Sequence, residues 1–114
     1  MTHRPIISDD PMYLLLRDRL VEEFNRRKAA GERPVLVHCE LTGMDLRDID
    51  ADGLDLTDAC LNDADLRGVD LRGAILRGAT LHGARIAGAY FGDELRAEEI
   101  DLSLQHGTRL RYRR

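Results

Sequence analysis

A five-residue repeat from residue 34 to residue 93 constrains the fold of this chain more than any other feature. We call the third residue of each unit its centre, and the centre is apolar in every unit. The residue two positions before the centre is never polar. The centres are Leu36, Leu41, Leu46, Ala51, Leu56, Leu61, Leu66, Leu71, Leu76, Leu81, Ile86 and Phe91.

A period of five fits neither a helix nor a flat strand. Five residues of an α-helix turn through about 500°, so the apolar positions would spiral around its surface. On a strand, successive centres would fall on opposite faces, whereas a centre and the residue two before it share a face. Each unit is therefore expected to be a very short strand with two inward side chains. A corner follows, usually at a glycine or an aspartate, which suit turns.

Repeated strand and corner units wind into a solenoid. The clearest units are residues 64–68 (Ala-Asp-Leu-Arg-Gly) and 69–73 (Val-Asp-Leu-Arg-Gly), and this pattern resembles the pentapeptide-repeat proteins. The resemblance implies a mainly β fold, a right-handed quadrilateral β-helix with four units per coil and about three coils. Stacked strands lie about 4.8 Å apart, so such a solenoid is only about 14 Å tall. Its expected core is Leu41, Leu46, Leu56, Leu61, Leu66, Leu71, Leu76, Leu81, Ile86 and Phe91.

The repeat divides the chain into three segments, residues 1–33, 34–93 and 94–114. In the first, Asp9 or Asp10 is expected to cap one amphipathic helix that Pro11 begins and that ends near Gly31. The apolar stripe of this helix has two interpretations, a lid on the solenoid or a docking helix for a partner protein. Membrane attachment is not expected, because the polar face carries both signs of charge. The stripe consists of Met12, Leu16, Leu20 and Phe24.

The last segment is expected to cover Phe91 at the open end of the solenoid. Residues 94–99 favour a helical turn, while residues 100–104 and 110–113 alternate in polarity around a turn at residues 105–108, which predicts a hairpin. The alternative is that this segment exchanges with a second chain and forms a homodimer.

Charge is unevenly distributed, although the formal net charge is only −4. Residues 40–66 carry nine acids and one arginine, whereas residues 67–92 carry four arginines and one acid. One interpretation is that an aspartate directly before a centre bonds backbone amides at the corner. The other is that an acidic face binds a basic partner, since some family members resemble duplex DNA and bind gyrase, a type II topoisomerase. The candidate acidic face is Asp45, Asp50, Asp52, Asp55 and Asp65.

The sequence offers no catalytic constellation, metal site or cofactor site. The serines lie in the terminal segments and the histidines are scattered. Aromatic residues make up only 4% of the chain, so binding of nucleic acid by base stacking is not expected. No apolar run is long enough to span a bilayer and no signal-peptide core is present, which favours a cytoplasmic protein without membrane contact. The predicted function is a non-enzymatic protein–protein interaction or scaffold module, and the alternative is a DNA mimic that binds gyrase.

Overall fold

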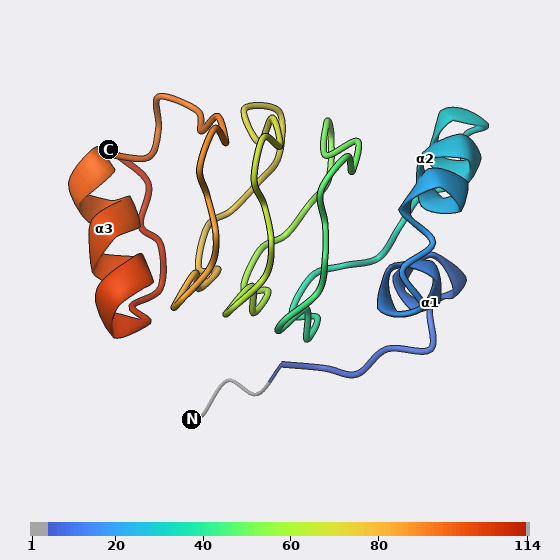
Figure 1. Ribbon diagram of the computed structural model, residues 1–114, viewed down its shortest axis with the longest axis horizontal. Helices are drawn as coiled ribbons and strands as arrows, with labels where there is room; N and C mark the ends of the chain where they lie inside the picture. The colour runs from blue at the N-terminus through green and yellow to red at the C-terminus, as the bar shows by residue number, and fades with distance from the viewer. Residues whose placement is uncertain (1–4, 114) are drawn as a thin grey trace.

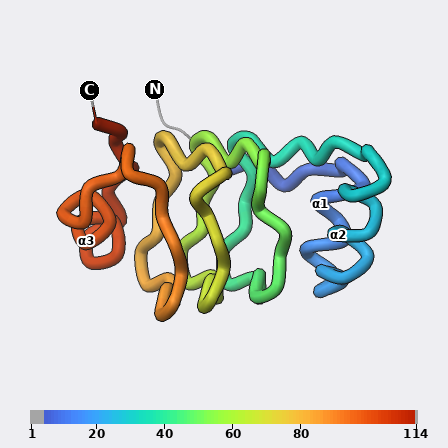
Figure 2. The backbone as a smooth tube through the Cα atoms, turned by 90° about the horizontal axis from the view of Figure 1, so that it is seen from above, coloured from blue at the N-terminus to red at the C-terminus, as the bar shows by residue number. Residues whose placement is uncertain are grey.

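The computed structural model describes residues 5–113 and places a stack of coils between a pair of helices and a third helix (Figure 1). At the N-terminal end lie α1 (Pro11–Arg17) and α2 (Val21–Ala29), and at the C-terminal end lies α3 (Ala97–His106). The view from above shows the same order, with the coils side by side and the helices beyond them (Figure 2). The middle of the chain is therefore enclosed at both ends.

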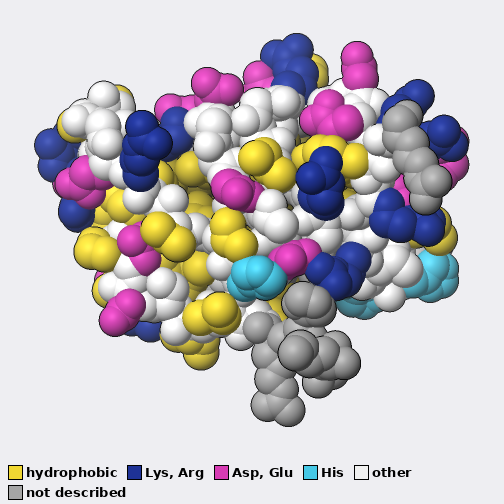
Figure 3. All heavy atoms as spheres, turned by 180° about the vertical axis from the view of Figure 1, so that it is seen from behind, with side chains coloured by type: hydrophobic (Ala, Val, Ile, Leu, Met, Phe, Trp, Pro, Cys, Tyr) yellow, Lys and Arg dark blue, Asp and Glu magenta, His cyan; other side chains and the backbone are white. Residues whose placement is uncertain are grey.

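Residues twenty positions apart pair with each other through the coil stack, as the resemblance implies. Beside the Cys60–Thr80 bridge, the amide N–H of Leu61 donates to the carbonyl of Thr80 (2.9 Å). Beside the Asp65–Arg85 bridge, the amide N–H of Leu66 donates to the carbonyl of Arg85 (2.8 Å). Each coil therefore holds four five-residue units, and its outer walls carry charged side chains of both signs (Figure 3). The parallel bridges with this spacing are Glu40–Cys60, Asp45–Asp65, Asp55–Ile75, Cys60–Thr80, Asp65–Arg85 and Asp70–Tyr90.

Residues 5–113 do not have the expected mainly β local structure. Their β-bridges are isolated and form no continuous strand. The reason lies in the corners. The amide N–H of Ala64 donates to the carbonyl of Leu61 (3.1 Å), and that of Ala59 to Leu56 (3.0 Å). Such a turn recurs in almost every unit and leaves too few extended residues between corners for a strand. The right-handed winding and the square cross-section stay predictions.

Corner residues adopt the left-handed backbone region, where glycine is unstrained. Gly68 has φ +74°, and Asp58 and Asp63 both have φ +59°. Aspartate tolerates this region better than most residues because its short side chain can bond locally. Gly73 is different, since its φ is not positive and an added Cβ would instead overlap Oδ1 of Asp52.

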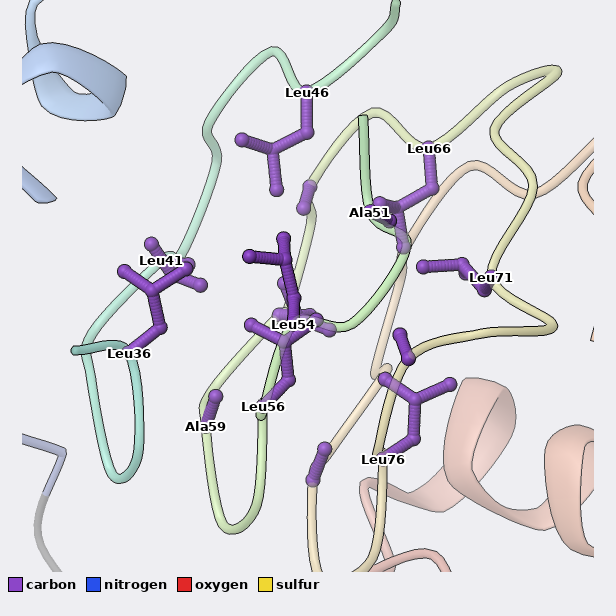
Figure 4. Packing of buried hydrophobic residues seen from close by; sticks show 14 of the residues in the cluster. Leu36, Leu41, Leu46, Ala51, Leu54, Leu56, Ala59, Leu66, Leu71 and Leu76 are labelled. Carbon is purple, nitrogen blue, oxygen red and sulfur yellow. The ribbon is translucent and has the colours of Figure 1, made fainter. Parts of the chain in front are cut away.

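The side chains of the centres, and those of many residues two positions before them, fill the inside of the coils (Figure 4). Ile86 and Phe91 are only partly buried. Both lie in the last coil, beyond the stretch of residues 76–83 whose amides bond to the C-terminal segment. The remaining expected core residues are buried: Leu41, Leu46, Leu56, Leu61, Leu66, Leu71, Leu76 and Leu81.

The single N-terminal helix expected from the apolar stripe is wrong, because the chain turns between α1 and α2. Arg19 has φ +62° and interrupts the helical backbone. Asp10 caps α1 as expected, since its Oδ2 accepts from the amide of Tyr13 (3.1 Å). The turn leaves Leu20 49% exposed, so this member of the stripe does not join the core. Met12, Leu16 and Phe24 do belong to the buried cluster.

The C-terminal hairpin is also wrong, because residues 100–104 lie within α3. Leucine and isoleucine at positions 100, 102 and 104 alternate, but residues 100, 103 and 104 also share one face of a helix. The helix buries Ser103 and leaves Leu102 40% exposed. Gly107 ends it with φ +71°.

Candidate interaction surfaces

Side chains of α1 and α2 close the first coil. Asn25 acts on two neighbouring backbone groups, since its Nδ2 donates to the carbonyl of Asp48 (2.8 Å) and its Oδ1 accepts from the amide of Asp50 (2.8 Å). The hydroxyl of Tyr13 donates to the carbonyl of Glu40 (2.8 Å), and burial raises its pKa. These contacts favour the interpretation of this segment as a lid on the solenoid.

The segment around α3 closes the last coil in the same manner. The amide of Leu81 donates to Oγ of Ser103 (2.8 Å), and the amide of Leu76 donates to the hydroxyl of Tyr112 (2.7 Å). Leu110 is buried, and its carbonyl accepts from the amide of Gly78 (2.8 Å). These acceptors lie where a further coil would supply its carbonyl groups, so the C-terminal edge is paired along residues 76–83.

The structure does not gather the five candidate acidic residues on one face. Asp45 and Asp65 are bridge partners on one wall, whereas Asp55 pairs with Ile75 on another. Asp50 and Asp52 precede Asp70 and Arg72 by one coil, which places them on a third wall. The five aspartates, which are close together in the sequence, therefore face different directions.

Several of these carboxylates are also paired with basic side chains. Arg67 binds Asp65 (Nη2–Oδ2 2.7 Å) and lowers the pKa of that carboxyl to about 2. Arg47 binds Asp45 (2.7 Å) and lowers its pKa in the same way, and Lys28 of α2 binds Asp50 (3.1 Å). The negative charge available to a partner is therefore smaller than the sequence suggests.

The aspartates also bond backbone amides two residues further on, as predicted from their position before a centre. Oδ1 of Asp65 accepts from the amide of Arg67 (3.2 Å), and Oδ1 of Asp55 accepts from the amide of Thr57 (3.0 Å). This prediction is confirmed, and it gives the aspartates a structural role in the first two coils, whereas no unit of the last coil has an aspartate directly before its centre.

One wall carries two exposed apolar side chains, with one aspartate between them and one arginine beside them. We call it the first wall, and it is formed by Val35, Asp55, Thr57, Ile75 and Arg77 in successive coils. Val35 is 59% exposed and Ile75 is 43% exposed. The inward centres beside them fill the core, whereas these side chains point away from it and are exposed.

A groove continues the first wall at its C-terminal end. We call it the arginine groove, and it has a volume of about 620 Å³. The guanidinium of Arg77 lies 4.8 Å from the centre of the Tyr112 ring. Sequence reasoning missed this site because it assigned residues 110–113 to a hairpin, although arginines at alternate positions were visible there. The lining residues are Thr57, Asp58, Arg77, Gly78, Arg109, Leu110, Arg111, Tyr112 and Arg113.

Comparison with models of protein families shows to which family this chain belongs. The family model described as pentapeptide repeats matches residues 35–68 and 63–93, with eight copies of the repeat, and so covers more than half of the chain. The chain belongs to the pentapeptide-repeat family. The coil stack is thus a pentapeptide-repeat domain whose terminal helices lie outside the matched residues. Comparisons with curated proteins and with solved structures find no match.

Two further properties concern the described part of this pentapeptide-repeat protein. Its helices are too short and too polar to cross a membrane. Within residues 5–113, histidine, cysteine and acidic side chains form no group of three or more that could hold a metal ion.

Proposed function

We propose that this pentapeptide-repeat protein is a non-enzymatic interaction module, a right-handed quadrilateral β-helix that binds a protein partner through its outer surface. The observation that carries the proposal is that a capping segment is hydrogen-bonded to the coil stack at each end. Asn25 and Tyr112 form hydrogen bonds with backbone groups at the ends of the stack that would otherwise be free to pair with another chain. A partner is therefore expected to bind the outer walls of the coils. The cytoplasmic location expected from the sequence is part of this proposal.

The first wall is the surface that best fits a protein partner. Val35 and Ile75 offer apolar area on one wall, and Arg77 lies beside them at its C-terminal end. Protein interfaces commonly combine an apolar centre with arginine and aromatic side chains and exclude most other charges. Arg77 and Tyr112 supply the arginine and the aromatic side chain of such an interface.

The DNA-mimic alternative has less support. A mimic of duplex DNA needs a long row of accessible negative charges, about one for every 1.7 Å of axis. Here the candidate aspartates face three walls, and Arg47 and Arg67 bind two of them. We therefore propose the protein-binding function alone.

The proposal is tested by affinity capture from a lysate of the native host at low and high salt, with bound proteins identified by mass spectrometry. Ile75→Glu alters the first wall, and Leu102→Glu is the matched control, because the two side chains are similarly exposed (43% and 40%) on different surfaces. We expect a partner that withstands high salt, binds the wild type and Leu102→Glu, and is lost by Ile75→Glu.

Other outcomes of the capture would overturn the proposal. Recovery of a type II topoisomerase that high salt releases would support the DNA mimic. Recovery of the bait alone would point to a second copy of the chain as the partner. In that case the chain should form a dimer in solution, and a variant that lacks residues 94–114 should not.

A further inference from the structure

Arginines gather around the extended segment that follows α3. The arginine groove adjoins a second hollow of about 530 Å³, which is lined by Arg96, Glu99 and residues 111–113. Together the two hollows contain five arginines and two carboxylates, those of Asp58 and Glu99. This part of a chain with net charge −4 therefore has a local excess of positive charge.

The arginines of this segment occur at alternate positions and lie on its exposed side. Leu110 is 1% exposed and Tyr112 is half-buried, whereas Arg109, Arg111 and Arg113 between and beside them are exposed. Alternate side chains of an extended chain repeat about every 6.6–6.8 Å. The same interval separates alternate side chains of an extended peptide that lies alongside.

Several of these guanidinium groups are held in place before any ligand binds. Arg109 is ion-paired to Asp58, and Arg111 is ion-paired to Glu99 (2.8 Å). Arg77 is fixed over the ring of Tyr112. A preorganised side chain loses less conformational entropy when a ligand binds, so the groove needs fewer new contacts.

We propose that the arginine groove binds an extended acidic peptide segment of the partner protein, whose alternate carboxylates lie against Arg109, Arg111 and Arg113. The inference rests on the proposed function and adds the chemistry of the partner. A peptide fits better than nucleic acid, because stacking of bases needs open aromatic faces. The aromatic side chain that lines the groove is that of Tyr112, which is half-buried and has the guanidinium of Arg77 over its ring.

The test uses a fluorescently labelled eight-residue peptide in which glutamate and serine alternate. Its binding to the full chain is followed by anisotropy at low salt. Arg113→Glu reverses one charge of the groove, and Arg85→Glu makes the same reversal on the wall that carries Asp65. We expect Arg113→Glu to weaken binding at least about tenfold, while Arg85→Glu leaves it within about twofold.

A second peptide of the same composition, four glutamates followed by four serines, tests the alternating register. We expect it to bind more weakly, and equal binding would overturn the register. Absence of binding by the alternating peptide, or tighter binding of a single-stranded oligonucleotide of equal charge, would overturn the acidic-peptide assignment. Failure of the acidic-peptide assignment can be distinguished from failure of the proposed protein-binding function. A partner captured by Arg113→Glu but lost by Ile75→Glu would leave the first wall as the interface without the groove.

Discussion

Arg109 is ion-paired to Asp58 across Gly78, which joins the segment after α3 to a coil corner fifty-one residues earlier in the chain. A Cβ added to Gly78 would overlap Oδ1 of Asp58 and lie 2.9 Å from Nη2 of Arg109. The absence of a side chain at residue 78 is therefore what lets the C-terminal cap reach this corner.

Gly78→Ala is expected to destabilise the protein more than Gly43→Ala. Both glycines have positive φ (+78° and +71°), so each alanine pays a backbone cost of about 1–2 kcal/mol. Only residue 78 adds the clash, because nothing lies within 4 Å of a Cβ at residue 43. Denaturant unfolding measures both. The excess should shrink when Asp58 is also changed to alanine, and equal effects in all backgrounds would show that the cap does not crowd residue 78.

Asn25→Ala tests the closure of the first coil. The variant loses two hydrogen bonds to the backbone of residues 48 and 50, and we expect it to lower the free energy of unfolding by about 1–2 kcal/mol. Glu22→Ala is the control, because Glu22 is exposed on the same helix. If both variants unfold at the same denaturant concentration, Asn25 contributes nothing to the cap.

The repeat alone predicts the coils, because every unit carries the same information about what faces inward. Leu66 and Leu71 are buried for the reason visible in the sequence, an apolar centre every five residues. The local role of Asp65 at its corner was equally accessible. Repetition averages out local ambiguity, so these inferences needed no knowledge of the tertiary structure.

The caps could not be predicted in the same detail, because their sequences fit more than one local structure. Ile100, Leu102 and Leu104 satisfy a strand pattern, whereas the helix packs Ile100 and Leu104 against the core and lets the buried Ser103 accept from Leu81. Nothing near Arg19 in the sequence requires the left-handed conformation that separates α1 from α2. The arginine groove was hidden for a related reason, since docking of the cap is what brings Arg77 to Tyr112.

Leu66→Ala is expected to lower the free energy of unfolding by about 2–5 kcal/mol, as truncation of buried leucines does. Leu66 is 1% exposed within the coil stack. Ile75→Ala is the control, because its side chain is 43% exposed, and we expect a loss below about 1 kcal/mol. A change below about half a kcal/mol for Leu66→Ala in chemical denaturation would place Leu66 outside the core.

Acid is expected to destabilise the protein partly through Asp65. Its pKa is about 2 in the folded chain, because Arg67 binds the charged carboxylate, and about 3.9 in an unfolded chain. Between about pH 4 and pH 2 the unfolded chain therefore binds more protons, and stability falls as the pH is lowered. This contribution is fully present above pH 4.

Asp65→Asn removes that contribution, so its unfolding free energy should fall less steeply than that of the wild type between pH 4 and pH 2. Denaturant midpoints across this range measure the slope. Asp101→Asn, on the exposed face of α3, serves as the control and should keep the slope of the wild type. Equal slopes for the wild type and Asp65→Asn would mean that the ion pair with Arg67 does not favour the folded state.

Amide hydrogen exchange at the two ends of the pentapeptide-repeat stack tests most directly whether the caps close it. The amides of Asp50, Leu76 and Leu81 donate to side chains of the caps, whereas those of Leu61 and Leu66 donate to the next coil. We predict that all five are protected to a similar degree in the native protein. Exchange of Asp50, Leu76 and Leu81 at the rate of an unstructured chain, while Leu61 and Leu66 stay protected, would contradict the closed stack.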